Sequence, residues 1–125
     1  MFPTNAATKI YLAVGVTDLR KSFDTLCGVV RSWGENSEAE SSNDVDPLSG
    51  HLFVFCNRRR DRIKVLFFDG NGLWICAKRL ERGNFNWPDA MNGADKATVS
   101  QQDLALLLGG VDLDNTRQRR WWRKA

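Results

Sequence analysis

The sequence has no run of about 18 or more apolar residues, so it offers no candidate transmembrane helix. Its first residues, MFPTN, lack the charged start and apolar middle of a secretory signal peptide. Cysteine is scarce, because Cys27, Cys56 and Cys76 lie far apart and form no Cys-x-x-Cys pair. These absences predict a soluble, cytoplasmic chain with buried free thiols and no membrane partner, and they disfavour a structural zinc site.

The sequence also lacks a recognisable catalytic constellation. His51 is the single histidine, and its place at the start of a strand favours a structural hydrogen bond over a role as a base. The carboxylates are scattered, whereas a two-metal nuclease needs several acids that converge on cations. Gly70-Asn71-Gly72 is too short for a phosphate-binding loop. We therefore predict no catalytic residues, no cofactor, no metal ligands and no enzyme activity.

The chain does contain enough apolar residues for one modest core, since they make up 42% of its 125 residues. It also contains alternating patterns that indicate strands. We expect an α+β single domain over residues 1–125, built on an antiparallel β-meander of about four to five strands. Two turns, at 57–61 and 69–72, separate the three central strands. The expected strands cover residues 9–14, 51–56, 62–68, 73–78 and, as a short edge strand, 84–88.

Two helices are expected, at about 18–33 and 101–109. In the first, Leu19, Phe23, Leu26, Val30 and Trp33 recur at helical spacing as one apolar stripe, and Thr17 or Asp18 is a candidate N-cap. The second follows a sequence that resembles a capping box, with Ser100 three residues before Asp103. An acidic flexible loop is expected at 35–49, a polar loop at 89–97 and a basic C-terminal tail at 115–125.

Both faces of the meander are mostly apolar. Pairing the second and third central strands places Ile63, Val65 and Phe67 with Trp74 and Cys76 on one face. The opposite face carries Leu66, Phe68, Leu73 and Ile75. A sheet in a small domain usually exposes one face to solvent. Because both faces are apolar here, we expect the second face to be covered by a helix, by the tail or by a partner.

The net charge of +3 conceals a strong separation of charge. Residues 35–46 hold five acidic and no basic residues, and residues 47–88 hold eight basic and three acidic ones. The tail 115–125 adds five basic residues and no acidic one. Arginine clusters suit phosphate groups because the planar guanidinium matches their geometry, but a merely solvated charged face is the plain alternative.

The sharpest cluster is the turn NRRRDR at 57–62, which projects four arginines from a hairpin tip. Arg79 and Arg82 leave the far end of the third central strand, which lies at the same pole of the sheet as that turn. The predicted contact surface for nucleic acid or a protein partner comprises Arg20, Lys21, Arg58, Arg59, Arg60, Arg62, Lys64, Lys78, Arg79 and Arg82.

Taken together, these segments resemble a known family. The matching stretches include VTDLRKSFD at 16–24, GHLFVF at 50–55, DRIKVL at 61–66, DGNGL at 69–73 and KRLERGNF at 78–85. They resemble the accessory protein of insertion sequence 66-type bacterial transposons, the product of the second open reading frame, often labelled TnpB. The sequence departs from that pattern in its acidic loop and at Phe68, where a tryptophan is common.

The resemblance implies a role in DNA transposition beside a separate transposase that carries the catalytic acids. We expect the chain to bind transposon DNA, the transposase or both through the basic surface, with Asp18 or Glu81 paired to an arginine as a structural alternative for some of these positions. A protein-interaction module or homodimer without DNA contact is the second hypothesis. A cryptic metal-dependent enzyme, whose acids meet only after folding, is the third.

Overall fold

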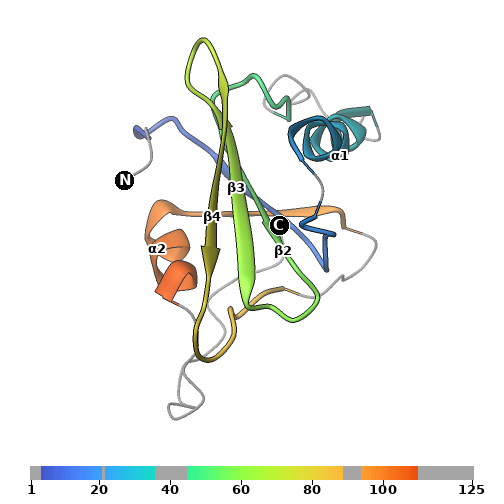
Figure 1. Cartoon of the computed structure of the whole chain (residues 1–125). Helices are drawn as coiled ribbons and strands as arrows, with labels where there is room; N and C mark the ends of the chain where they lie inside the picture. The colour runs from blue at the N-terminus through green and yellow to red at the C-terminus, as the bar shows by residue number, and fades with distance from the viewer. Residues whose placement is uncertain (1–3, 21, 36–44, 89–93, 110–125) are drawn as a thin grey trace.

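The computed structural model describes residues 4–20, 22–35, 45–88 and 94–109. One five-stranded sheet lies between two helices, α1 on one face and α2 on the other (Figure 1), and the α+β class is confirmed. The elements are β1 (Ile10–Ala13), α1 (Phe23–Glu35), β2 (Leu52–Cys56), β3 (Arg62–Phe68), β4 (Leu73–Arg79), β5 (Lys96–Val99) and α2 (Gln101–Gly109).

The sheet is mixed rather than purely antiparallel. Its strand order is β4-β3-β2-β1-β5, and the expected meander is confirmed for β2, β3 and β4. β1, however, pairs parallel to β2, with Tyr11 opposite Phe53. Parallel neighbours need a long crossover, and α1 lies in the connection between these two strands. The meander prediction missed this pairing because strand patterns carry no direction.

The expected register of β3 and β4 is confirmed. Val65 lies opposite Cys76 and Phe67 opposite Trp74, so these side chains share one face, and Leu66 and Ile75 share the other. The 69–72 turn closes with the amide of Asp69 donating to the Gly72 carbonyl at 3.0 Å, while Gly70 adopts a φ of 112°. A glycine carries that conformation without the steric cost that a Cβ would bring.

Helix α1 begins later than expected. Asp18 accepts the Arg20 amide at 3.0 Å in a local turn, and the first helical bond runs from the Leu26 amide to the Ser22 carbonyl at 3.1 Å. Leu26, Val30 and Trp33 are buried as the stripe predicts, whereas Phe23 is 43% exposed. Phe23 is the first residue of α1 and so lies at the end of the helical stripe.

Helix α2 follows the capping prediction. The Ser100 hydroxyl accepts the Asp103 amide at 3.0 Å, and the Ser100 carbonyl accepts the Leu104 amide at 3.0 Å. One orphan amide of the first turn is thereby satisfied. Leu104 and Leu107 are the buried residues of this helix.

Two strand predictions need correction. Residues 84–88 form no strand, although Phe85 and Trp87 are buried as the alternation suggests. The Trp87 indole donates to the Ala13 carbonyl at 2.9 Å, so this segment crosses the sheet face instead of joining its edge. The fifth strand is β5, which pairs antiparallel with β1 and begins inside the stretch assigned to a polar loop. The sequence KATV is too short and too mixed to signal a strand.

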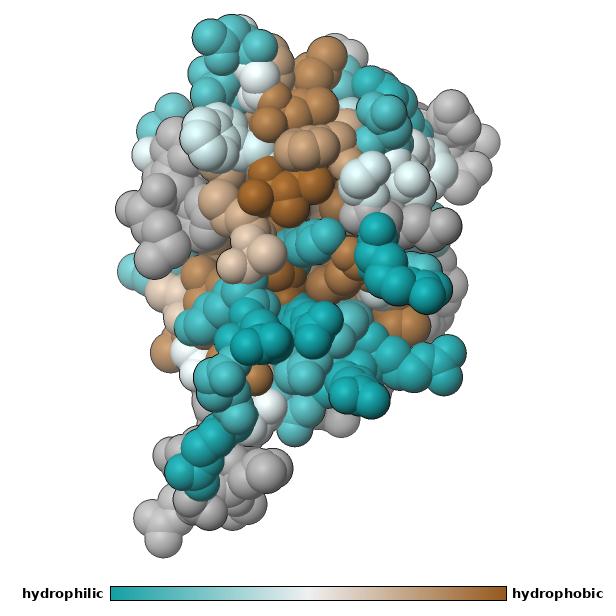
Figure 2. All heavy atoms as spheres, viewed as in Figure 1, coloured by the Kyte–Doolittle hydropathy of each residue, from teal (hydrophilic) through white to brown (hydrophobic). Residues whose placement is uncertain are grey.

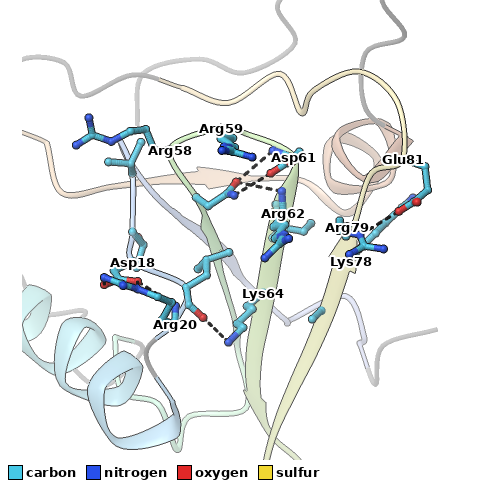
Figure 3. A pocket seen from close by; sticks show the side chains of 16 residues that line it. Asp18, Arg20, Arg58, Arg59, Asp61, Arg62, Lys64, Lys78, Arg79 and Glu81 are labelled. Carbon is cyan, nitrogen blue, oxygen red and sulfur yellow. Dashed lines mark hydrogen bonds and ion pairs between the residues drawn. The ribbon is translucent and has the colours of Figure 1, made fainter.

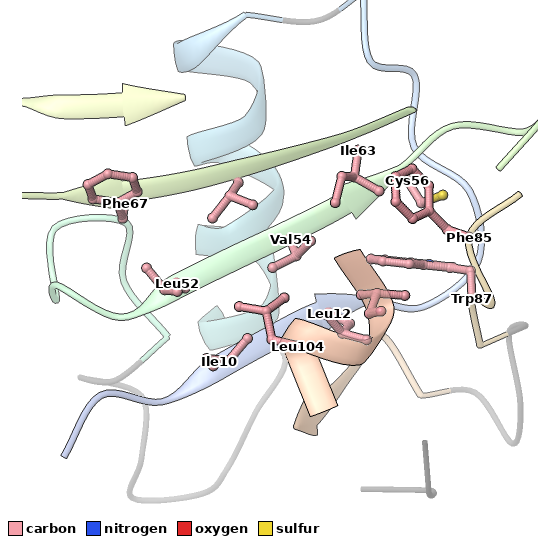
Figure 4. Packing of buried hydrophobic residues seen from close by; sticks show 12 residues of the cluster. Ile10, Leu12, Leu52, Val54, Cys56, Ile63, Phe67, Phe85, Trp87 and Leu104 are labelled. Atoms are coloured by element: carbon pink, nitrogen blue, oxygen red, sulfur yellow. The ribbon is translucent and has the colours of Figure 1, made fainter. Parts of the chain in front are cut away.

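The apolar residues divide into two cores, one on each sheet face. On one face, Val54, Val65 and Leu12 pack with Leu104 of α2 and with Trp87 (Figure 4). On the other, Phe53 and Phe55 pack with Trp33 of α1. The described chain thus covers the second apolar face by itself, largely with α1.

Four expected features fall partly or wholly outside the described residues: Lys21, the segment 36–44 of the acidic loop, the segment 89–93 of the polar loop, and the basic tail 115–125. The described end of the acidic loop is a turn, in which the Ser49 amide donates to the Asp46 carbonyl at 2.9 Å. Val45 is buried against the α1 core, so that end of the loop is anchored.

Candidate functional site: a basic pocket at one pole of the sheet

The parallel pairing of β1 and β2 determines where the charged loops meet. Parallel strands end at the same edge of a sheet, so the loop after β1 lies beside the turn after β2. The Thr17 amide donates to the Cys56 carbonyl at 2.8 Å and ties the two loops together. Because β3 starts and β4 ends at this pole, the arginines of all four strand ends gather there.

These segments surround an open pocket of about 1130 Å³ (Figure 3). The described residues of its lining include seven basic and three acidic side chains, a formal charge of +4. The basic residues are Arg20, Arg58, Arg59, Arg62, Lys64, Lys78 and Arg79, and the acidic ones are Asp18, Asp61 and Glu81. The structure therefore brings seven of the ten residues of the expected contact surface into one pocket.

The 57–61 turn is organised by Asn57. Its side-chain carbonyl accepts the amides of Asp61 and Arg62 at 3.1 and 3.0 Å, and its side-chain amide donates to the Asp61 carboxylate at 2.8 Å. The Leu80 amide donates to the Asp61 carbonyl at 2.7 Å and fixes the end of β4 to the same turn. The turn is thus held by hydrogen bonds that leave the Arg58 and Arg59 side chains pointing outward.

Two of the cations are paired with carboxylates, as the structural alternative predicted. Arg20 makes a bidentate pair with Asp18 at 3.0 and 2.9 Å, and this hydrogen bonding and charge raise the pKa of the Arg20 guanidinium. Arg79 pairs with Glu81 at 3.0 Å. Both pairs are solvent-exposed, so they add little to stability and can exchange partners readily.

The two lysines are directed to backbone carbonyls. Lys64 donates to the Leu19 carbonyl at 2.5 Å and links β3 to the loop before α1. Lys78 donates to the Leu108 carbonyl at 2.7 Å, next to the C-terminal end of α2, where a cation is favourable. Both ammonium groups therefore hold the pocket walls in place.

Arg58, Arg59 and Arg62 differ from these cations. All three are exposed, and within the described ranges their side chains have no hydrogen bond or ion pair. All three line the pocket, so their guanidinium donors are available to a ligand.

The remaining residues of the expected surface lie elsewhere. Arg60 is half-buried, and its guanidinium donates to the Trp87 carbonyl at 3.0 Å. It is also the one non-glycine residue of the described segments with a positive φ, 60°, a conformation that favours glycine. Arg82 is exposed but does not line the pocket, and Lys21 lies outside the described residues.

Sequence reasoning did not single out the apolar and amide residues of the pocket, among them Val16 and Asn57. Val16 carries no signal by itself, because only the parallel pairing brings it to the turn. Asn57 could have been found, since an asparagine that opens a short turn often bonds the amides that follow it.

Other chemistry is sparse in the described part of the chain. No group of three or more metal-ligating side chains occurs among those residues. None of their helices is long and apolar enough to cross a membrane. His51 accepts the Lys9 amide at 2.9 Å, in line with the structural role expected for it.

The fold and the pocket define a small α+β protein with a preformed basic surface. The model of a family described as IS66 Orf2 like protein matches residues 8–118. The chain therefore belongs to the IS66 Orf2-like family, which makes it an accessory protein associated with transposition.

Two relatives come from Sinorhizobium fredii. The one named "Uncharacterized protein y4hO" is 33% identical over 123 residues, covering 98% of this chain and 96% of the relative. The one named "Uncharacterized protein y4jC" is 28% identical over 119 residues, covering 95% of this chain and 92% of the relative. No solved structure matches the chain.

Proposed function

We propose that this accessory protein binds transposon DNA through the basic pocket, with Arg58, Arg59 and Arg62 as its phosphate contacts. The observation that carries the proposal is the set of three exposed guanidinium groups, without a described partner, that line a pocket whose described residues carry a formal charge of +4. Guanidinium groups bind phosphate oxygens through two parallel hydrogen bonds, and such contacts supply much of the affinity for DNA.

The pocket suits the sugar-phosphate backbone better than bases. Among the described residues that line it, none is an aromatic side chain on which a base could stack. The paired residues Asp18–Arg20 and Glu81–Arg79 flank the three arginines and fix where a phosphate can sit, because each carboxylate repels it. Contacts of this kind position a protein on DNA without reading its sequence.

The test is fluorescence anisotropy with a labelled duplex from a transposon end. The variant Arg58→Ala/Arg59→Ala/Arg62→Ala should lose most of the affinity of the unmodified protein. The matched control, Lys9→Ala/Arg31→Ala/Lys96→Ala, removes the same three positive charges outside the pocket. The control should bind nearly as well as the unmodified protein. Equal losses in the two variants would mean that net charge, and not the pocket, holds the DNA.

A protein partner is the second candidate, and Val16 favours it. This residue lines the pocket and is 51% exposed, an apolar surface that a phosphate backbone does not bury. An acidic segment of the transposase with one apolar side chain would use both features. Val16→Ser should then weaken capture of the purified transposase and leave DNA affinity unchanged, which calorimetry with each partner would measure.

A further inference from the structure

The sheet ends on β4, and no strand of the described chain pairs with its outer edge. In Figure 1 the sheet is seen nearly along this edge, with β4 in front and the two helices on either side. A strand edge carries a row of unpaired amide and carbonyl groups, which makes it a template for pairing with another strand.

The backbone groups that face outward can be identified. The Asp69 amide donates to Gly72, and the Leu80 amide donates to Asp61, which marks hydrogen-bonded pairs at both ends of the β3–β4 hairpin. Such pairs alternate with pairs that do not bond each other. Residues 73, 75, 77 and 79 therefore direct their amides and carbonyls away from β3.

The surface along this edge is apolar. Leu73, Ile75 and Cys76 are half-buried, and Trp74 is 53% exposed. Figure 2, in the same view, shows an apolar strip over β4 that gives way to hydrophilic side chains at the pole where β4 ends. The pairing with β3 is continuous from Phe68 to Arg62, so no bulge twists the edge away, and the strand has no proline.

We propose that two copies of the chain pair antiparallel through β4, with Cys76 of one copy opposite Cys76 of the other. When a two-fold axis perpendicular to the sheet relates the two strands, residues that face each other lie on the same face of the sheet. One residue must therefore face its own copy across the axis. Cys76 is the middle residue of the seven in β4, and this register alone overlaps the whole strand. It also joins the outward groups of residue 75 to those of residue 77 in the partner.

The second copy is favoured because β4 is self-complementary in this register. Lys78 of each copy faces Trp74 of the other on one side of the sheet, and an ammonium group over an indole ring is attractive. Arg79 faces Leu73, beside the turn that holds Asp69. No two cations oppose each other, and the apolar residues of the two copies meet at the middle of the strands, where Ile75 faces Ala77 and Cys76 faces Cys76.

The proposal does not rest on DNA binding, because it uses the backbone edge of β4 and not the three arginines, although Ala77, Lys78 and Arg79 also line the pocket. It does have a consequence for the pocket. Antiparallel pairing places the two basic poles at opposite ends of the joined strands, roughly 20 Å apart for six steps along β4. A dimer would then present two pockets.

The first test is the mass of the full chain in solution by sedimentation velocity. A dimer of the 14.2 kDa chain is expected at micromolar concentration. Ala77→Pro should give a folded monomer. Proline removes the outward-facing amide of residue 77, which β3 does not use, and the side chain that it replaces is an exposed methyl group. Ala77→Ser keeps the amide and should stay dimeric. Circular dichroism checks that both variants are folded.

The second test starts from the unmodified chain, and a variant serves only as its control. Facing cysteines in a non-hydrogen-bonded pair lie about 4.5 Å apart at their Cα atoms, which permits a disulfide. A mild oxidant should therefore link two chains through Cys76, and Cys76→Ser should abolish the link, since Cys27 and Cys56 are buried. A monomer, or a dimer that neither links at Cys76 nor responds to Ala77→Pro, would overturn the proposal. Capture of a transposase segment by a monomeric chain through this edge would also count against it.

Discussion

At the scale of single residues, neighbouring arginines of one turn have different structural roles. The Arg59 side chain projects from the turn without a described partner, whereas Arg60 is half-buried and its guanidinium donates to the Trp87 carbonyl. The sequence showed a run of like residues and could not separate them, because the separation depends on the left-handed backbone at Arg60 and on a carbonyl 27 residues away.

We expect Arg59→Ala to affect DNA binding and Arg60→Ala to affect stability. Arg59→Ala should weaken DNA binding about five- to tenfold at 0.1 M salt, the value of one phosphate contact, with no change in stability. Arg60→Ala should lower the free energy of unfolding by about 1–2 kcal/mol because a charged, half-buried hydrogen bond is lost. Urea unfolding and anisotropy on both variants measure this. Arg60→Gly should be less destabilised than Arg60→Ala, since glycine relieves the positive φ.

The ionisation of Asp69 gives a prediction about pH dependence. The Trp74 indole, at 2.6 Å, and then the amides of Asn71 and Gly72 hold the pKa of this carboxyl below its ordinary value of 3.8. The folded state favours the charged carboxylate. Its contribution to the free energy of unfolding is therefore complete above pH 3.8 and is lost as the pH falls through the lower, folded-state pKa. The NMR signal of the Trp74 indole N–H should shift with a midpoint below 3.8. A midpoint at or above 3.8 would mean that the bond is not formed.

At the scale of elements, the sequence predicted what is local and missed what is remote. The β3–β4 register followed from the 69–72 turn and the two-residue period, and the α2 cap followed from Ser100. The parallel direction of β1, the late start of α1 and the existence of β5 did not follow. Each depends on contacts between distant segments, such as Thr17 with Cys56 or Val14 with Asp95.

The segment with Phe85 and Trp87 shows how such a remote contact stabilises the fold. Trp87 is 1% exposed, and its indole bonds the Ala13 carbonyl at the end of β1. We expect Trp87→Phe to lower the free energy of unfolding by about 1–3 kcal/mol, because a buried carbonyl loses its donor. Denaturant unfolding measures the loss. Trp74→Phe is the control, because it also removes an indole hydrogen bond, the one to Asp69, but an exposed one, and it leaves both cores intact. An equal loss there would contradict the assignment.

At the scale of the whole molecule, two cores share one sheet and bury two of the three thiols. Burial raises the pKa of the Cys56 thiol to about 12 and also raises that of Cys27, so neither forms the reactive thiolate near neutral pH. Cys76 lies on the edge strand and is half-exposed. In the folded Ala77→Pro variant, where no partner strand covers β4, we expect a thiol reagent to modify Cys76 first, and all three cysteines only after unfolding. Mass spectrometry of the labelled peptides identifies each site, and early labelling of Cys56 would show that the core opens.

The same scale explains how much of the pocket the sequence revealed. Seven of ten expected contact residues line it, since the basic turn and the end of β4 are adjacent in any meander. The loop with Asp18 and Arg20 joins them only through the parallel pairing, so composition alone could not place it there. Which cations are available, and which are paired with Asp18, Glu81 or a backbone carbonyl, is a property of the folded molecule.

The central claim is that the pocket holds DNA through phosphate contacts, and the salt dependence of binding tests it most directly. The logarithm of the association constant should fall linearly with the logarithm of salt concentration, with a slope of about −0.9 for each phosphate neutralised. Removing Arg58, Arg59 and Arg62 should make that slope shallower by roughly three contacts, whereas the control triple variant outside the pocket should keep the slope of the unmodified protein. No binding at low salt, or the same slope in all three proteins, would contradict the claim.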